Sequence, residues 1–329
     1  MPHSHHSHSG QFCKHASGTL EEVVLAAIER GFEVYGLTEH VPRYRAEDLY
    51  PEEESMAPDG LLDQFDAFVE EAHRLKRAYA DKISLLVGLE TEHITSDDLD
   101  RLDALLERYG PRIEYIVGSV HHVNAIPIDF DKEMYQRAAL SCSSEDRLSE
   151  HERLDLFFEA YFDAQYKVLE RFLPAIVGHV DLCRLYTPDL SLKAYPKGWN
   201  GLERNVKFAV NHGLLFEANA AAFRKGWKTG YPSWEVLIKQ YGGRFALSDD
   251  SHKPEAVGLN YARLHDYLQA AGVTELWHLR EIQADPDSTA GQVAEETASN
   301  GQRLRRRLVK PAKMAGDWRQ HGFWATMGA

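Results

Sequence analysis

Histidines crowd the start of the chain, which begins Met-Pro-His-Ser-His-His-Ser-His. If residues 6–8 are extended, the two-residue period of a strand puts His6 and His8 on one face, and His15 follows after a polar turn. Neighbouring imidazoles are good ligands for transition metals. An expression tag or a disordered histidine-rich tract would give a similar composition. The interrupting serines and the direct continuation into a helix count against a tag.

The same residue types recur where β-rich apolar runs end. Strands are predicted at 33–38, 83–89, 113–120, 175–178, 214–219 and 244–247. A lone histidine at a strand end is usually structural, but the carboxyl ends of parallel strands form the active-site face of an α/β barrel. Histidine or carboxylate at so many strand ends is hard to obtain by chance. These residues are His40, Glu90, His121, His179, Asp250 and His252.

The number of candidate ligands predicts more than one ion. Because each ion needs about four ligands, the set implies two or three divalent ions. Glu90 is the natural bridge, since a carboxylate can join two ions and an imidazole normally does not. Ions about 3.5–4 Å apart activate water and clamp phosphoryl oxygens, which indicates phosphoester hydrolysis. The candidate metal ligands are His6, His8, His15, His40, Glu90, His121, His179, Asp250 and His252.

Helices alternate with these strands. They are predicted at 20–30, 61–80, 97–109, 152–172, 200–212, 233–241 and 261–271, with a capping box at 19–22 opening the first. Residues 42–60 and 123–150 are expected to be polar loops. Roughly seven βα units favour an α/β fold with parallel strands, either a barrel or a doubly wound sheet.

Composition narrows the class of protein. The 329 residues and 43% hydrophobic content suit one α/β barrel. No run of eighteen apolar residues predicts a membrane span, and the N-terminus lacks the apolar core of a secretory signal. Three cysteines without regular spacing favour a reducing compartment, the cytoplasm. A net charge of −14 counts against a general nucleic-acid binder.

The chain is expected to divide into a catalytic barrel, residues 1–283, and a C-terminal extension, residues 284–329. The extension is basic between 302 and 319, where seven Lys and Arg residues face one acid, Asp317. This stretch either binds an acidic partner or is a solvated tail, partly helical or disordered.

The motifs, taken in order, resemble those of the PHP (polymerase and histidinol phosphatase) metallohydrolases between residues 3 and about 258. The resemblance implies a distorted (β/α)7 barrel with a trinuclear site of zinc, manganese or iron at the carboxyl ends of the strands. The motifs are His6-x-His8, His15, Thr38-Glu-His40, Gly88-Leu-Glu90, Gly118-Ser-Val-His121, Gly178-His-Val-Asp181 and Asp250-Ser-His252.

The resemblance also implies how the ligands are shared. One ion would be held by His6, His8, Glu90 and Asp250. A second would be held by Glu90, His121 and His179. The third would be held by His15, His40 and His252. Asp250 is preferred over Asp249 because it gives the spacing Asp-x-His.

Within the family, the chain is most similar to the histidinol-phosphate phosphatases, in the segments 39–43, 127–131 and 223–225. The implied reaction is hydrolysis of L-histidinol phosphate to L-histidinol and phosphate in histidine biosynthesis. The catalytic residues implied are Glu90, His179 and Asp250, which would act through the metal ions, and Arg224, which would add charge stabilisation. The alternatives are a PHP phosphoesterase for another small ester or a nucleic-acid end, and a non-catalytic protein that stores or senses metal.

Substrate contacts are harder to predict. Arg224 is the preferred phosphate anchor because its planar guanidinium can grip oxygens in pairs. Cys13 is expected only to pack. Further candidates for the phosphate are Lys225, Arg184 and Arg43, another substrate contact is His122, and the candidates for the substrate amine are the acidic loop 47–54, Glu217 and Asp131.

Overall fold

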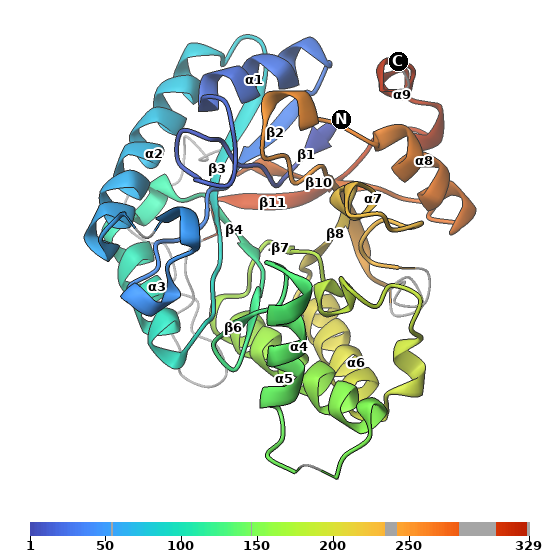
Figure 1. Cartoon of the computed structure of the whole chain (residues 1–329). Coiled ribbons are helices and arrows are strands. Elements are labelled where there is room, and N and C mark those ends of the chain that lie inside the picture. Colours follow the sequence, from blue (N-terminus) through green and yellow to red (C-terminus); the bar gives the residue numbers. More distant parts are fainter. Residues whose placement is uncertain (54, 146, 234–241, 283–306, 328–329) are drawn as a thin grey trace.

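Seven parallel strands form a nearly closed barrel in the computed structural model, which describes residues 1–53, 55–145, 147–233, 242–282 and 307–327 (Figure 1). The strands lie side by side in chain order, so each βα unit places its strand beside the last one. This confirms the predicted barrel. Its strands are β1 (His3–Ser4), β2 (Val34–Leu37), β3 (Ser84–Glu90), β4 (Tyr115–Gly118), β7 (Ile176–Val177), β8 (Leu215–Asn219) and β9 (Arg244–Ser248).

The barrel closes between its first and last strands through a few contacts instead of a full ladder. The backbone N–H of His5 donates to the carbonyl of Leu247 at 3.3 Å. Beyond both strands, Ser7 and Ser251 form an isolated parallel bridge, and the N–H of His8 donates to the carbonyl of Ser251 at 2.7 Å. This seam joins the two segments that carry the first and last predicted ligands.

Helices surround the strands (Figure 1). The capping box predicted at Thr19 and Glu22 is present and opens the first helix; such a cap contributes about 1 kcal/mol. The predicted helix at 233–241 lies almost entirely outside the described residues. The described helices are α1 (Leu20–Glu29), α2 (Pro58–Ala78), α3 (Ser96–Tyr109), α4 (Lys132–Ser141), α5 (Glu150–Phe172), α6 (Pro196–Asn211), α7 (Ala221–Arg224), α8 (Tyr261–Ala270) and α9 (Phe323–Thr326).

The prediction of a polar loop at 123–150 was wrong. This stretch contains β6 (Ile126–Pro127), which pairs with β5 (His122–Val123), and helix α4. Asp131 caps α4 by accepting from the N–H of Met134 at 2.7 Å. The helix buries only Tyr135 and Ala138, so its apolar stripe was too narrow to recognise in the sequence.

An antiparallel ribbon lies at the end of the barrel where the strands begin. It pairs β10 (Trp277–Glu281) with β11 (Val309–Lys313), and Phe245 of β9 bridges to Leu276 just before the ribbon. Leu279 and Val309 of the ribbon join the apolar side chains inside the barrel. The N–H of Leu279 also donates to the buried ring of His5 at 2.9 Å. The ribbon therefore covers this end and leaves the carboxyl end for function.

The described C-terminal residues, 307–327, pack on the barrel. Trp318, Phe323 and Met327 belong to the main hydrophobic core, and Trp318 is 1% exposed. The division into a barrel, 1–283, and an extension, 284–329, stays a prediction. Among the basic residues of the extension, those at 303, 305 and 306 lie outside the described residues.

Candidate metal centre

The predicted ligands converge at the carboxyl end of the barrel. Four overlapping groups form there, and the ligand atoms within each group lie within 4.8 Å of one another. All nine residues predicted to bind metal belong to at least one group. The groups are His6, His8 and Glu90; Glu90, His121 and His179; His8, Asp250 and His252; and Cys13, His15, His40 and His252.

Glu90, the last residue of β3, stands at the middle of the assembly. Its side chain is 1% exposed, and both carboxylate oxygens face imidazole nitrogens. This placement is the one expected of a carboxylate that bridges two ions. The contacts of Oε1 are His6 Nε2 at 3.1 Å, His179 Nε2 at 3.1 Å and His121 Nε2 at 3.3 Å, and those of Oε2 are His40 Nδ1 at 2.9 Å and His8 Nε2 at 3.3 Å.

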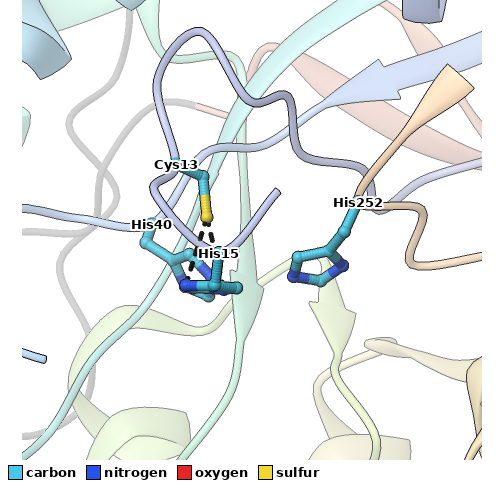
Figure 2. Close-up of side chains that lie close together, drawn as sticks. All are labelled: Cys13, His15, His40 and His252. Atoms are coloured by element: carbon cyan, nitrogen blue, oxygen red, sulfur yellow. Dashed lines mark hydrogen bonds between the residues drawn. The ribbon is translucent and has the colours of Figure 1, made fainter. Parts of the chain in front are cut away.

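Figure 2 shows the group at the edge of this assembly, where Cys13 points at the imidazoles of His15 and His40 with His252 opposite. The sulfur of Cys13 lies 3.2 Å from Nε2 of His15. The rings of His15 and His252 are 5.1 Å apart between centroids. A single cysteine carries no spacing signal, so the sequence predicts for Cys13 no role beyond that of a packing residue or a bystander.

Carboxylates behind the histidines hold several rings in place. Glu217 accepts from His6 Nδ1 at 2.8 Å and, through its other oxygen, from the backbone N–H of His179 at 2.7 Å. Glu92 lies 3.3 Å from His121 Nδ1. Such partners fix the orientation of ligand histidines and raise their basicity. Only a weak signal in the sequence points to Glu92, namely that residues 90 and 92 share a face when the chain is extended.

Asp250, and not Asp249, faces the ligand groups. Asp249 accepts hydrogen bonds from the Ser4 hydroxyl at 3.0 Å and the N–H of Gly258 at 2.7 Å. Its carboxylate therefore binds groups of the barrel wall and does not face the ligand groups. Asp250 has a φ of +47°, a left-handed conformation that is strained for a residue with a side chain. This turn aims its carboxylate at the cluster.

The charges of these groups suit a cation. Burial raises the pKa of Glu90, but the imidazoles of His6, His121 and His40 outweigh it and hold the pKa well below its usual range. In His8, burial lowers the pKa, yet the carboxylates of Glu39 and Glu90 raise it to about 9. Without metal, protons on the histidines around Glu90 therefore balance the charge of the carboxylates. A divalent ion can replace these protons.

The pKa values shift differently in the outer group, which consists of Cys13, His15, His40 and His252. Burial, followed by the charge of His8, lowers the pKa of His15 to about 4. The same two causes lower the pKa of His40 and of His252 well below the usual value. These rings are neutral at physiological pH, and a neutral imidazole has the lone pair that a metal requires.

Unsatisfied nitrogens provide a further test of whether the residues fit metal. In the described part of the chain, Nε2 of His40 and Nδ1 of His179 are buried without a hydrogen-bond partner. His6 Nε2 and His8 Nε2 face each other at 3.1 Å. Buried polar atoms are rarely left unpaired, and two facing imidazole nitrogens need a proton or a cation between them. The set therefore fits a cluster of divalent metal ions.

A cavity of about 380 Å³ opens above the cluster. Two of its cations, Arg224 and Lys225, are among the predicted phosphate contacts. The guanidinium of Arg224 donates to the carbonyl oxygens of Asp249 at 2.9 Å and Asp250 at 2.6 Å, which holds it beside the ligand turn. The other lining residues outside the ligand groups are Tyr50, Glu52, Asp129, Phe130, Leu182 and Tyr231.

The remaining substrate candidates do not line this cavity. Arg43 pairs with Glu53 and is 4% exposed. Arg184 is 3% exposed and donates to the carbonyl oxygens of residues 188 and 190 at 2.6 Å each. His122 lies 3.0 Å from Glu92. Buried partners thus occupy all three side chains, which leaves none of them facing the cavity.

Two candidates for the substrate amine also form hydrogen bonds with other groups of the protein. Glu217 supports His6 and His179, as described above, and Asp131 caps helix α4. The structure places Asp129, two residues before Asp131, and Glu52 of the acidic loop along the cavity instead. An extended chain turns residues 129 and 131 to the same face, so the sequence could not separate them.

Comparison with known proteins agrees with this geometry. The model of the PHP domain family matches residues 4–221. The chain belongs to the PHP domain family.

Named relatives of this PHP chain are histidinol-phosphatases. A probable histidinol-phosphatase of Schizosaccharomyces pombe is 43% identical over 305 residues, which cover 91% of this chain and 95% of that protein. The histidinol-phosphatase of Saccharomyces cerevisiae is 32% identical over 301 residues, which cover 81% of this chain and 88% of that protein.

Solved structures share the PHP barrel. The putative histidinol phosphatase of Listeria monocytogenes superposes with a TM-score of 0.65 at 22% identity, covering 79% of this chain and 98% of that one. The histidinol phosphate phosphatase of Lactococcus lactis, solved with zinc, L-histidinol and phosphate, gives a TM-score of 0.61 at 20% identity, covering 84% and 95%.

Proposed function

We propose that this chain is a metal-dependent histidinol-phosphatase, which hydrolyses L-histidinol phosphate to L-histidinol and phosphate in histidine biosynthesis. The observation that carries the proposal is the cavity, whose floor is a set of metal-type ligands and whose walls hold both cations and acids. The similarity to two fungal relatives named histidinol-phosphatase over most of their length supports the choice of substrate.

We divide the nine ligands among three metal positions as the resemblance to the family implies, and the group of His8, Asp250 and His252 then spans the first and third positions. Divalent ions bound there would supply positive charge to phosphoryl oxygens and lower the pKa of water. The resemblance to the family implies zinc, manganese or iron, and nitrogen and carboxylate ligands suit these ions. The first position takes His6, His8, Glu90 and Asp250, the second takes Glu90, His121 and His179, and the third takes His15, His40 and His252.

Arg224 and Lys225 would bind the phosphate. Both line the cavity and stand next to the turn that carries Asp250. A guanidinium held by two carbonyl oxygens is pre-positioned, so it loses little entropy when a phosphate oxygen arrives. Its charge also stabilises the transition state, in which the phosphoryl oxygens remain negative.

Asp129 and Glu52 would bind the protonated amine. They line the same cavity, and Tyr50 and Phe130 stack there at 6.0 Å between ring centroids. Carboxylates match an ammonium group, and aromatic faces accept both a cation and an imidazole. A wall with acids and aromatic rings therefore fits a substrate that has an amine, an imidazole and a phosphate.

The cellular setting follows from the same features. The acidic chain and a site lined by carboxylates favour a small-molecule substrate over nucleic acid. No helix in the described part of the chain combines the length and apolar character that a membrane crossing requires. We place the enzyme in the cytoplasm, where the three cysteines would stay reduced.

The substrate is tested with a panel of phosphate esters on one metal-analysed sample. Phosphate release from L-histidinol phosphate should exceed that from p-nitrophenyl phosphate and nucleoside monophosphates by about tenfold or more in kcat/KM, one contact of about 1.4 kcal/mol. Equal rates across the panel would leave a metallophosphatase and remove the histidine-pathway assignment. A preference for a nucleic-acid end that weakens with salt would favour the alternative PHP activity.

A further inference from the structure

The sulfur of Cys13 lies beside the histidines at the edge of the ligand assembly. Cys13 lies on the loop between His8 and His15, is 5% exposed, and points its sulfur toward the outer histidines (Figure 2). Its Sγ lies 3.4 Å and 3.2 Å from the two ring nitrogens of His15.

We propose that Cys13 is the fourth ligand of the third metal position, binding as a thiolate together with His15, His40 and His252. This inference rests on the metal centre proposed above, but it is independent of the identity of the substrate. The resemblance to the family assigns three histidines to this position and no sulfur.

The geometry of the group suits a tetrahedral ion. With Zn–S near 2.3 Å and Zn–N near 2.1 Å, sulfur and nitrogen ligands around one ion stand roughly 3.5 Å apart. The separations between Cys13 and His15 are close to that value, and the ligand atoms of all four residues lie within 4.8 Å of one another.

A second observation points to a ligand independently of the cysteine. Nε2 of His40 is buried without a hydrogen-bond partner in the described structure, whereas Nδ1 lies 2.9 Å from Glu90 Oε2. Nε2 is therefore the nitrogen that His40 offers to the group of Cys13, His15 and His252. Because a buried ring nitrogen without a partner is costly, this group fits an ion better than it fits a packed core.

Charge gives the proposal a chemical consequence. The first two positions include carboxylates, whereas the third has only imidazoles apart from Cys13. When a divalent ion M²⁺ binds, the S–H bond breaks, the M–S bond forms and the proton goes to solvent. A thiolate favours zinc, cobalt or ferrous iron over manganese or magnesium. The third position should therefore be more selective for soft metals than the other two.

Cobalt substitution tests the ligand directly. The full chain is stripped of metal, reloaded with Co²⁺, and measured for cobalt content and for the near-ultraviolet charge-transfer band that a thiolate gives on Co²⁺. We expect three cobalt ions and this band in the natural protein. The band should vanish in Cys13→Ser, which keeps the size of the side chain. It should persist in Cys142→Ser, because Cys142 follows the last residue of helix α4 and belongs to none of the ligand groups.

Affinity provides a readout that does not depend on colour. Loss of a partner behind a ligand typically costs about 10–100-fold in metal affinity, so loss of a direct ligand should weaken the third equivalent of cobalt by at least about 100-fold. The first two equivalents should bind Cys13→Ser as they bind the natural protein.

The other outcomes separate two kinds of failure. Three cobalt ions without the band in the natural protein, or a band that survives in Cys13→Ser, would overturn the role of Cys13 and leave the three-ion centre standing. Fewer than three ions in the natural protein would overturn the third position itself, and with it this inference.

Discussion

Replacement of Glu90 by glutamine is the sharpest test of the centre. The change keeps the size of a side chain that is 1% exposed but removes its charge, while five imidazole nitrogens lie within 3.3 Å of its oxygens. Removing one partner from a buried charged pair costs about 3–5 kcal/mol. Applied to metal binding, this predicts a loss of about two to four orders of magnitude in affinity. Glu90→Gln should therefore lose at least one metal equivalent and nearly all turnover.

The matched control for this variant is Glu92→Gln. Glu92 is also buried, at 3% exposed, and it contacts His121 and His122 from behind without belonging to a ligand group. Its loss should cost only about 10–100-fold in metal affinity. Calorimetric titration of zinc into the metal-free proteins, metal content after dialysis and phosphate release measure the difference, and circular dichroism checks the fold. The bridging role would be refuted by full metal content and normal activity in Glu90→Gln, or by a larger loss in Glu92→Gln.

Three further outcomes are expected. His8→Ala should lose metal, whereas His3→Ala should keep it. The His3 variant should instead lose about 1–3 kcal/mol of stability, because the buried His3 ring accepts a hydrogen bond from the N–H of Leu247 at 2.8 Å. Metal loss in His3→Ala alone would contradict the placement of these histidines. Arg224→Ala should reduce kcat/KM by roughly a hundredfold with unchanged metal content, the 2–3 kcal/mol of a charge-assisted contact, and an unchanged KM would argue against a phosphate anchor. Zinc binding should release protons at pH 7.5, because the pKa of His8 is raised to about 9 in the metal-free site. The proton released from His8 should disappear as the pH rises through that value. Proton uptake on zinc binding would contradict the assigned charges.

The stability of the metal-free protein should also depend on the protonation of His8. The folded pKa of His8 is above its unfolded value, so its protonation stabilises the fold fully below about pH 6.5. This contribution is lost as the pH rises through about 9. Chemical denaturation of the metal-free chain across this window should show declining stability, and His8→Gln should flatten the decline.

The sequence predicted most of the centre because its ligands follow apolar strands. A buried strand such as β3 is recognisable from its composition, and its last residue is then placed by the barrel geometry, as for Glu90. His6 and His8 lie beyond β1, yet their rings are still close, with centroids 5.0 Å apart. The extended backbone after the strand keeps the two-residue period on which the prediction depended.

The features that periodicity did not place have a common physical origin, which is tertiary contact or the shape of a loop. Arg184 and Arg43 have the chemistry of phosphate ligands, but buried carbonyl and carboxylate partners occupy them. The pairing of β10 with β11 and the contact of Cys13 with His15 depend on tertiary packing or on the shape of a loop. Periodicity carries no information about such contacts, so they could not be read from the sequence.

The seam between β1 and β9 has a consequence for biosynthesis. Ser4 and Asp249, hydrogen-bonded across it, are 245 positions apart in the chain. At roughly 5–20 residues per second, translation separates them by roughly 10–50 s. During that interval the histidine-rich N-terminus has no barrel to join, because the strand that completes its environment has not been made. Metal incorporation is therefore a late event, and a truncated or stalled chain would carry the first ligands without any means to assemble them.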